Sequence, residues 1–285
     1  MKSKFSKILT ILLIGIFCIS LSGCGKETTK DTGKTTQSPE KKNLKIVDTS
    51  KNSRPYAVMI NNISVARPLQ SGLQDAYIIY ELIAEGGITR YMALFMDQNT
   101  ERIGSIRSAR HYFLDYALEN DAIYVHHGQS PQAQRDFSAL GVDRIVVDNS
   151  KTGWRDKSLN VASEHTLFTS IEKLNNGLGS KRTTRNNDLL LKGGKLNDAY
   201  INDLLLNYSV DEVDISKKEG AKVANNVSIT YSSNTVTSYK YDETNKYYLR
   251  SVNGKAHTDY VTKEQYHFKN IITYQVKNYT LNDGE

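Results

Sequence analysis

Cysteine is nearly absent from this chain of 285 residues, which contains only Cys18 and Cys24. Cys18 lies inside an apolar N-terminal run with the features of a cleaved leader, so Cys24 is the only cysteine expected in the mature protein. A single thiol excludes an internal disulfide framework. The folded part must therefore be held together by a hydrophobic core, which a chain of this length can form.

Net charge is absent from the globular part, although the whole chain carries a formal charge of +6. The first 23 residues contain three Lys, and residues 24–53 contain seven Lys against four acidic residues. From Arg54 onward there are 27 basic and 27 acidic residues. This balance argues against nucleic acid as a partner, whereas a basic segment near the N-terminus suits the surface of an anionic membrane.

The apolar run Ile8–Leu21 is too short for a typical membrane span. Three lysines precede it, and Leu21-Ser22-Gly23-Cys24 ends it. This arrangement predicts a secretory signal peptide over residues 1–23 with a lipobox in place of an ordinary cleavage site. It resembles the bacterial lipoprotein signal, which implies that Cys24 becomes the N-terminus and carries a diacylglycerol and a palmitate. We therefore expect a lipid anchor in the cell membrane, on the extracytoplasmic face.

Residues 24–53 lack aromatic side chains and are rich in Lys, Thr, Ser and Asp. Such a segment cannot bury enough apolar surface to fold, so it is predicted to be a disordered linker. It would space the folded part from the membrane.

Residues 54–175 predict a lobe in which strands and helices alternate. Between Ala109 and Glu119, apolar residues recur at helical spacing. Ser130-Pro131 is typical of a helix start, and Gly141 of a helix end. This order favours an α/β layered lobe. Strands are expected at Tyr56–Ile60, Ala76–Ala84, Arg90–Met96, Ala122–His126 and Arg144–Val147, and helices at Ala109–Glu119, Pro131–Leu140 and His165–Leu174.

Residues 176–285 predict a second, β-rich lobe. Lys181–Asn187 is expected to be a loop and Asp188–Leu206 a helix. Nine of the 18 Tyr lie from Tyr231 onward, which favours aromatic cross-strand pairs in an antiparallel sheet. The predicted fold class is therefore α+β, mixed, with an N-terminal α/β lobe and a β-rich antiparallel lobe. Strands of the second lobe are expected at Val227–Tyr231, Thr235–Tyr241, Lys246–Arg250 and Ile271–Val276.

Lysine is also absent between Lys51 and Lys151, although the chain contains 25 Lys. The same interval holds eight of the 12 Arg. Arg is required where a planar group must bind a carboxylate or a phosphate through two parallel hydrogen bonds. Two interpretations stay open: an anion-binding surface, or a structural network. In the second, these Arg would pair with acidic residues such as Glu81, Glu85, Asp97, Asp115 and Asp148.

Two polar loops of this interval are candidates for an anion site. Residues 104–110 lead into the helix expected at Ala109–Glu119, where backbone N–H groups would point outward. Residues 126–130 lie between the end of a strand and the start of a helix. In open α/β sheets, ligands bind beyond the carboxyl ends of the strands. The candidate ligand-binding residues are Arg90, Ser105, Arg107, Ser108, Arg110, His126, His127 and Gln129.

Other chemistry has less support in the same residues. His126 and His127 are adjacent on a strand and point to opposite faces, so they do not indicate a metal site. Serine is an ordinary helix cap, and we assign no catalytic residue and no cofactor. The acidic residues around Gly86-Gly87 could act as a carboxylate pair in glycoside hydrolysis, although pairing with Arg is favoured. Trp154 either stacks on a sugar or pins a loop, and we favour the second interpretation.

Five motifs stand out by their length: RPYAVMINN, ARPLQSGLQDAYIIYELIAEGGITRYMALF, IGSIRSAR, YVHHGQSP and YLRSVNGKAHTDY. They resemble the YerB-like family, lipoproteins of Gram-positive bacteria with a domain of unknown function. The resemblance runs from Arg54 to Ile272. It implies an α/β part and a β-rich part behind a lipid anchor, and it supplies no catalytic residues. Members of that family continue into a Gly-rich, Trp-containing end, so the resemblance implies truncation or missing last strands after Glu285, with an unpaired edge.

These observations predict a membrane-anchored, extracytoplasmic lipoprotein that acts as a binding or scaffold protein with an Arg-lined anion-binding crevice. Its expected partners are the cell membrane and an anionic cell-wall ligand or an envelope protein. The alternative is a cell-envelope enzyme acting on an anionic or glycan substrate. An enzyme would need a nucleophile or an acid–base pair with shifted pKa values in that crevice, whereas a binding protein needs only Arg, hydroxyl and N–H groups.

Overall fold

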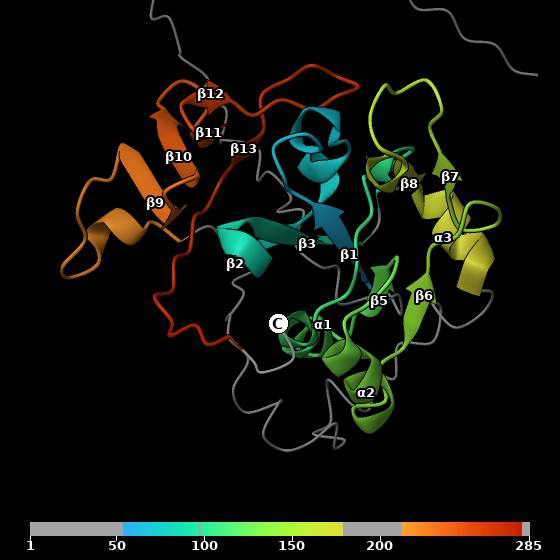
Figure 1. Cartoon of the computed structure of the whole chain (residues 1–285). Coiled ribbons are helices and arrows are strands. Elements are labelled where there is room, and N and C mark those ends of the chain that lie inside the picture. Colours follow the sequence, from blue (N-terminus) through green and yellow to red (C-terminus); the bar gives the residue numbers. More distant parts are fainter. Residues whose placement is uncertain (1–53, 97, 179–212, 281–285) are drawn as a thin grey trace, which may run out of the picture. The chain divides into compact units, whose positions relative to one another are not determined.

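The computed structural model describes residues 54–96, 98–178 and 213–280. The expected signal peptide, Cys24 and the linker over residues 24–53 lie outside the described residues. The same holds for the loop expected at Lys181–Asn187 and the helix expected at Asp188–Leu206. The described part contains an N-terminal α/β region and a β-rich C-terminal sheet, which confirms the predicted fold class (Figure 1).

The N-terminal region is built on a sheet with the strand order β2-β3-β1-β5-β6 (Figure 1). β2 and β3 pair antiparallel, β3 pairs antiparallel with β1, and β5 and β6 continue the sheet in parallel with β1. The carboxyl ends of β1, β5 and β6 therefore lie along one edge of the sheet. All five strands were predicted from the sequence: β1 (Tyr56–Asn61), β2 (Ile78–Ile83), β3 (Thr89–Phe95), β5 (Ile123–His126) and β6 (Arg144–Val146).

β1 occupies the centre of this sheet, and all six of its residues are buried. Tyr56, Val58 and Ile60 belong to the hydrophobic core on one face of the sheet. Ala57 and Met59 belong to a second core on the opposite face. A strand covered on both faces has a continuous apolar sequence rather than an alternating one, as the segment YAVMI does.

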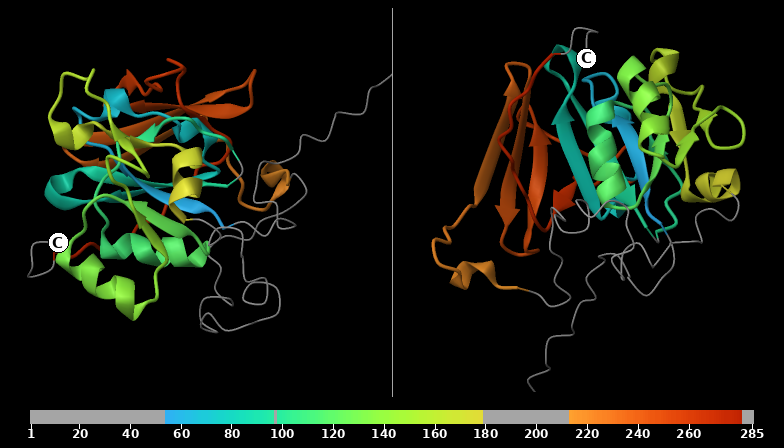
Figure 2. Two further views of the ribbon diagram at one scale, coloured as in Figure 1. Left: turned by 90° about the vertical axis from the view of Figure 1, so that its right-hand side faces the viewer. Right: turned by 90° about the horizontal axis from the view of Figure 1, so that it is seen from below.

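Two helices cover the face that carries Ala57 and Met59 (Figures 1 and 2). They are α1 (Leu114–Glu119) and α2 (Pro131–Ala139). The Ser130 side chain caps α2, because its Oγ accepts a hydrogen bond from the backbone N of Ala133 at 3.2 Å. The helix expected at Pro131–Leu140 is therefore confirmed together with its cap.

The helix expected at Ala109–Glu119 begins later than predicted. The backbone N of Ala109 donates to Gly128 O at 2.9 Å, and Arg110 is extended, with φ −132°. A 3-10 turn at His111–Phe113 leads into α1 at Leu114. Pairing with the loop after β5 holds Ala109 in an extended backbone, so residues 104–110 do not lead directly into a helix. The prediction of helical N–H groups at that position is wrong.

The other face of the large sheet packs against a small antiparallel sheet of β4 (Ile103–Gly104), β8 (Leu167–Thr169) and β7 (Trp154–Arg155), and against α3 (Ile171–Leu178). The prediction of a single helix at His165–Leu174 is wrong. The segment instead forms a 3-10 turn at Ser163–His165, then β8, then α3. β8 is fully buried between β4 and β7, and periodicity cannot distinguish such a short apolar strand from a helix.

The C-terminal sheet has the order β12-β11-β10-β9, with β13 also paired to β11. Three expected strands are confirmed, and Tyr241 lies opposite Tyr248 with ring centroids 5.0 Å apart. The strand expected at Ile271–Val276 is wrong: these residues have no regular structure, and the exposed Ile272 and Val276 face no partner strand within the described residues. The strands are β9 (Asn226–Ser232), β10 (Thr235–Asp242), β11 (Tyr247–Val252), β12 (Lys255–Ala256) and β13 (His267–Phe268).

Candidate functional site

The two polar loops identified in the sequence lie side by side at the carboxyl edge of the parallel strands. Residues 105–107 run along the end of β1, where Asn61 N donates to Ser105 O and Arg107 N donates to Met59 O, both at 2.9 Å. His127 N, just past the end of β5, donates to Arg107 O at 3.1 Å. The backbone of residues 105–110 therefore connects β1 to the loop that follows β5.

A group of polar and charged side chains lies at this edge, which we call the edge cluster: Arg107, His127, Arg155, Glu164 and His165. The Arg107 Nη2 donates to Glu164 Oε1 at 3.2 Å, and both side chains are accessible, with exposed fractions of 28% and 54%. The Arg155 guanidinium donates to the backbone O of Ser163 and lies 3.4 Å from Nε2 of the exposed His127. The cluster thus combines two guanidinium groups with one carboxylate.

The hydrogen bonds define the protonated nitrogen of each histidine in the edge cluster. His127 Nδ1–H donates to Val147 O at 2.7 Å, which leaves Nε2 as an acceptor facing Arg155. His165 Nδ1 accepts from the Asn61 amide at 3.0 Å, so its Nε2–H points toward Glu164 at 3.5 Å. Burial lowers the pKa of His165, against the opposing effect of Glu164, and nearby Arg107 lowers it further.

Arg90 and Arg110 converge on a different carboxylate, Glu85. Arg90 Nη2 lies 3.4 Å from Glu85 Oε2, and Arg110 bonds Glu85 Oε1. Arg90 also donates to the backbone O of Ser108 at 2.8 Å. Burial acts to raise the pKa of Glu85, but hydrogen bonding to Arg110 outweighs it, and the pKa lies below its ordinary value. Burial and the neighbouring Arg110 lower the pKa of Arg90 to about 10.

Of the remaining candidate residues, His126 and Ser105 lie in the interior, and Gln129 lies in the loop before α2. His126 is fully buried, its Nδ1–H donates to Gly128 O at 2.8 Å, and its ring stacks on Phe137 with centroids 5.1 Å apart. Burial lowers its pKa to about 4, so the ring is neutral in ordinary buffers. Ser105 is also fully buried, and its Oγ has no hydrogen-bond partner among the described residues. Gln129 donates to the Gln134 side chain at 2.7 Å.

The Arg-rich interval is largely committed to internal contacts. Within the described residues, at least five of its eight Arg form ion pairs: Arg54, Arg90, Arg102, Arg107 and Arg110. Two hollows on the described surface, of about 390 and 400 Å³, are lined by residues outside the candidate set. The arginines therefore serve the structural network in large part, and the Arg-lined crevice stays a prediction.

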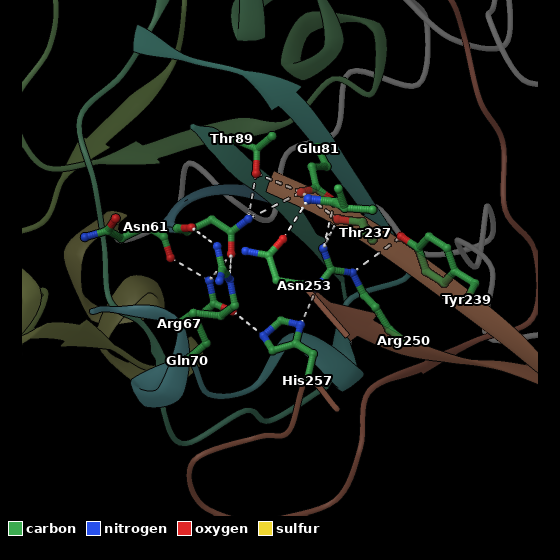
Figure 3. A network of polar contacts seen from close by, with 12 residues as sticks. Asn61, Arg67, Gln70, Glu81, Thr89, Thr237, Tyr239, Arg250, Asn253 and His257 are labelled. Carbon is green, nitrogen blue, oxygen red and sulfur yellow. Dashed lines mark hydrogen bonds and ion pairs between the residues drawn. The ribbon is translucent and has the colours of Figure 1, made fainter. Parts of the chain in front are cut away.

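A second polar network, which the sequence analysis missed, joins the N-terminal sheet to the C-terminal sheet (Figure 3). We call it the clamp network, and it comprises Gln70, Glu81, Thr237, Arg250 and His257. Arg250 Nη2 of β11 donates to Glu81 Oε2 of β2 at 2.8 Å and to Thr237 Oγ1 at 3.2 Å. The Arg250 and Glu81 side chains are 3% and 8% exposed.

His257 extends the clamp network toward the end of β1 (Figure 3). Its Nδ1 accepts from Arg250, so Nε2–H donates to Gln70 Oε1 at 2.6 Å. The Gln70 amide then donates to Asn61 O at 2.5 Å. Burial lowers the pKa of His257 well below its ordinary value, and nearby Arg250 adds to this effect. One signal existed in the sequence: Arg250 is the only Arg after Arg185, in a segment where Lys is common.

The described residues contain no group of three or more His, Cys, Asp or Glu side chains suited to a metal ion. None of the helices in those ranges has the length and apolar character needed to cross a membrane. What the structure defines is a mixed α/β protein with a buried clamp network and an accessible cluster at the carboxyl edge of its parallel strands.

Comparison with known proteins assigns the family. Residues 43–184 match the N-terminal domain of DUF3048, a protein of unknown function, and residues 227–285 match its C-terminal domain. "Putative lipoprotein YerB" of Bacillus subtilis (strain 168) is 31% identical over 276 residues, which cover 94% of this chain and 76% of that protein. The crystal structure of the YerB protein from Bacillus subtilis matches with a TM-score of 0.56 and 30% identity, over 79% of this chain and 71% of that one. The chain belongs to the DUF3048 family, which confirms the resemblance to YerB-like proteins.

Proposed function

We propose that this protein is a lipid-anchored binding protein on the extracytoplasmic face of the cell membrane, and that its edge cluster binds the phosphate or carboxylate groups of an anionic cell-wall polymer. The membrane location is supported by the lipobox that ends in Cys24 and by the name of the Bacillus subtilis relative. The anionic ligand is supported by the geometry of the edge cluster.

The observation that carries the proposal is the excess of accessible cations over carboxylates in the edge cluster. Arg155 contacts a backbone carbonyl and a histidine ring, and it pairs with no carboxylate among the described residues. Arg107 pairs with Glu164 through one contact between two accessible side chains. Exposed pairs of this kind contribute little free energy, about 0–1 kcal/mol, so a ligand anion can replace Glu164 at low cost. Guanidinium groups are suited to phosphate and carboxylate through bidentate hydrogen bonds.

The position of the edge cluster supports the same conclusion. It lies beyond the carboxyl ends of β1 and β5, where open α/β sheets bind their ligands. We do not propose the enzyme alternative, because no observation at this edge favours it. The Ser105 hydroxyl is buried, and the Ser108 hydroxyl has no hydrogen bond to a histidine or a carboxylate within the described ranges.

The binding proposal is tested by replacing both accessible guanidinium groups with Lys. In Arg107→Lys/Arg155→Lys, charge is kept and the bidentate fork is lost, so affinity of the full chain for a glycerol-phosphate oligomer or a polyglutamate should fall about tenfold. Isothermal titration calorimetry measures the affinity, and thermal melting confirms that the fold is intact. Arg135→Lys on α2 is the matched control and should bind as the parent does. Equal affinity of the double variant and the parent, or no binding of either polymer by the parent, would overturn the proposal.

The membrane location is tested independently through the lipobox. Cys24→Ala removes the acylated thiol, so the protein should leave the membrane fraction or accumulate as the unprocessed precursor. Fractionation of cells with detection of precursor and mature forms measures both outcomes. Processing and membrane retention equal to those of the parent would show that the anchor is assigned wrongly.

A further inference from the structure

A hollow of about 400 Å³ lies on the opposite side of β7 from the edge cluster. β7 consists of Trp154 and Arg155, and consecutive residues of a strand point to opposite faces. Arg155 contributes to the edge cluster, whereas Trp154 lines the hollow. The two sites are therefore distinct. The hollow is lined by Asn99, Glu101, Trp154, Ser170, Glu172 and Lys173.

The Trp154 ring is braced from one side and only partly buried. It lies opposite Phe168 of β8, with ring centroids 6.3 Å apart and an interplanar angle of 34°. The Arg102 guanidinium stacks on Phe168 at 3.6 Å from the ring centroid, which keeps Phe168 in position. The indole N–H of Trp154 makes no hydrogen bond within the described residues. A tryptophan that only pins a loop would be expected to bury its ring and satisfy this donor.

The polar groups around Trp154 are also unused. Glu101 and Glu172 are exposed, Lys173 is half-buried, and none of these three side chains forms an ion pair or a hydrogen bond in the described part of the chain. Two carboxylates and one ammonium group thus line the same hollow without neutralising one another. The Ser170 Oγ accepts from Lys173 N at 3.1 Å, which positions the start of α3.

An accessible indole ring surrounded by free hydrogen-bonding groups matches the two chemical faces of a pyranose ring. The C–H face of a sugar packs on an aromatic ring, and its hydroxyl groups donate to carboxylates and accept from ammonium and indole N–H groups. The lining carries two carboxylates against one ammonium group, which disfavours an acidic sugar. A volume of about 400 Å³ lies in the lower part of the range for small-molecule sites, which suits one or two sugar rings.

We propose that this hollow binds a neutral or amino sugar, with Trp154 as the stacking platform and Glu101, Glu172 and Lys173 as hydrogen-bonding groups. The sugar site stands independently of the anion-binding proposal, since it shares no residue with the edge cluster. Together the two sites would hold a polymer that carries both sugar rings and anionic groups.

The experiment uses the intrinsic fluorescence of the purified full chain, because Trp154 is its sole tryptophan and reports directly on the hollow. A neutral N-acetylglucosamine trimer or a glucosamine trimer should change the emission in a saturable way, and a galacturonate trimer should not. By calorimetry, Trp154→Ala should weaken sugar binding about tenfold or more, given the strength of aromatic contacts. Glu101→Gln and Glu172→Gln should each weaken it several-fold.

Two controls separate this site from the rest of the protein. Tyr279→Ala removes an aromatic ring that is 79% exposed elsewhere on the surface, and it should bind sugar as the parent does. The Arg107→Lys/Arg155→Lys variant should also keep sugar binding, so failure of the anion-binding proposal and failure of this one are distinguishable. Trp154→Phe keeps an aromatic ring if Trp154→Ala does not fold, and it should bind sugar more weakly than the parent.

The proposal is overturned if the parent's fluorescence does not respond to either trimer at millimolar concentration. It is also overturned if Trp154→Ala or Trp154→Phe binds sugar with the parent's affinity. A lower melting temperature of Trp154→Ala without any sugar effect in the parent would assign the ring to pinning the β7 loop alone.

Discussion

The clamp network and the edge cluster contain the same kinds of side chain in opposite environments. Each combines Arg, Glu and His, and the two are connected through Asn61, which contacts Gln70 on one side and His165 on the other. In the clamp network, the Arg250 and Glu81 side chains are 3% and 8% exposed. In the edge cluster, the Arg107 and Glu164 side chains are 28% and 54% exposed.

This difference in burial decides what each cluster can do. Arg250 bonds Tyr239, Glu81, Thr237 and His257, and its side chain is only 3% exposed, so the guanidinium is occupied by protein groups and is not accessible to a ligand. Loss of either Arg250 or Glu81 would leave the other charge buried without a partner, which is strongly unfavourable. The pair therefore holds β11 against β2. Arg107 and Arg155 are partly hydrated, and exchange of one anion for another costs little there. Arg content alone therefore predicts neither stability nor binding.

The largest expected effect comes from breaking the clamp network at Arg250. Arg250→Met leaves the Glu81 carboxylate buried without its partner, which should lower the free energy of unfolding by about 3–5 kcal/mol. Urea denaturation followed by circular dichroism measures the change. Lys240→Met, an exposed cation on β10, is the matched control and should cost far less. The double variant Glu81→Leu/Arg250→Met should lose less free energy of unfolding than the sum of the losses in Glu81→Leu and Arg250→Met. Equality with that sum would contradict an energetic coupling between the two side chains.

A second effect concerns acid stability through His126, the candidate residue that proved to lie in the core. Its pKa is about 4 in the folded protein, below the ordinary value of 6.5, so the unfolded chain binds more protons between these two pH values. The free energy of unfolding should therefore fall by about 3 kcal/mol as the pH drops from 6.5 to 4 because of this group. His126→Asn, which can keep the hydrogen bond to Gly128 O, should remove this part of the pH dependence.

The comparison with the neighbouring histidine sharpens that test. His127 is exposed, and His127→Gln serves as the matched control for replacing a histidine at the end of β5. Other titrating groups contribute equally to parent and variants, so the difference between the profiles isolates His126. A profile of His126→Asn identical to that of the parent would show that the buried ring does not control acid stability.

Glu85 should give an intermediate effect, because it neutralises two arginines and is itself partly exposed. Glu85→Gln removes the carboxylate shared by Arg90 and Arg110, while the bond from Arg90 to Ser108 O remains. We expect the free energy of unfolding to fall by about 1–2 kcal/mol. Chemical denaturation measures it, with the exposed Glu172→Gln on α3 as the control. If Glu85→Gln lost as much free energy of unfolding as Arg250→Met, Glu85 would be as important for stability as the clamp network, and the expected intermediate effect would be wrong.

The smallest effect on stability is expected at the edge cluster itself. Arg107→Met should change the free energy of unfolding by no more than about 0.5 kcal/mol, because its ion pair with Glu164 is accessible and screened. The same variant should lose affinity for the glycerol-phosphate oligomer in calorimetry. A large loss of stability without any change in binding would reverse the assignment of the two clusters.

The sequence predicted the elements whose patterns are local. The continuous apolar sequence of β1 is enough to recognise a buried strand. Ser130-Pro131 likewise marks the start of α2 without reference to the rest of the chain. Two of the errors fall where a distant partner overrides the local pattern. Ala109 is held extended by Gly128, and Leu167–Thr169 is drawn into a strand by β4 and β7.

The candidate site shows the same division. The sequence indicated that residues 104–110 and 126–130 carry unusual polar groups, and the structure brings the two loops together. It could not show that His126 stacks on Phe137 in the interior while His127 is exposed, because the direction of each side chain depends on which face of β5 is covered by α2. Binding of a ligand at this edge stays a prediction.

By itself, the sequence determined that no disulfide crosslinks the part from Arg54 onward, which contains no cysteine, that this part is electrically balanced, and that an α/β region precedes a β-rich sheet. These properties depend on composition and on patterns within single segments. Only the tertiary structure decided which arginines are buried and which are accessible. Glu81 and Arg250 are 169 residues apart, and their pairing depends on how two sheets pack, since burial is a property of the assembled fold and not of any one segment.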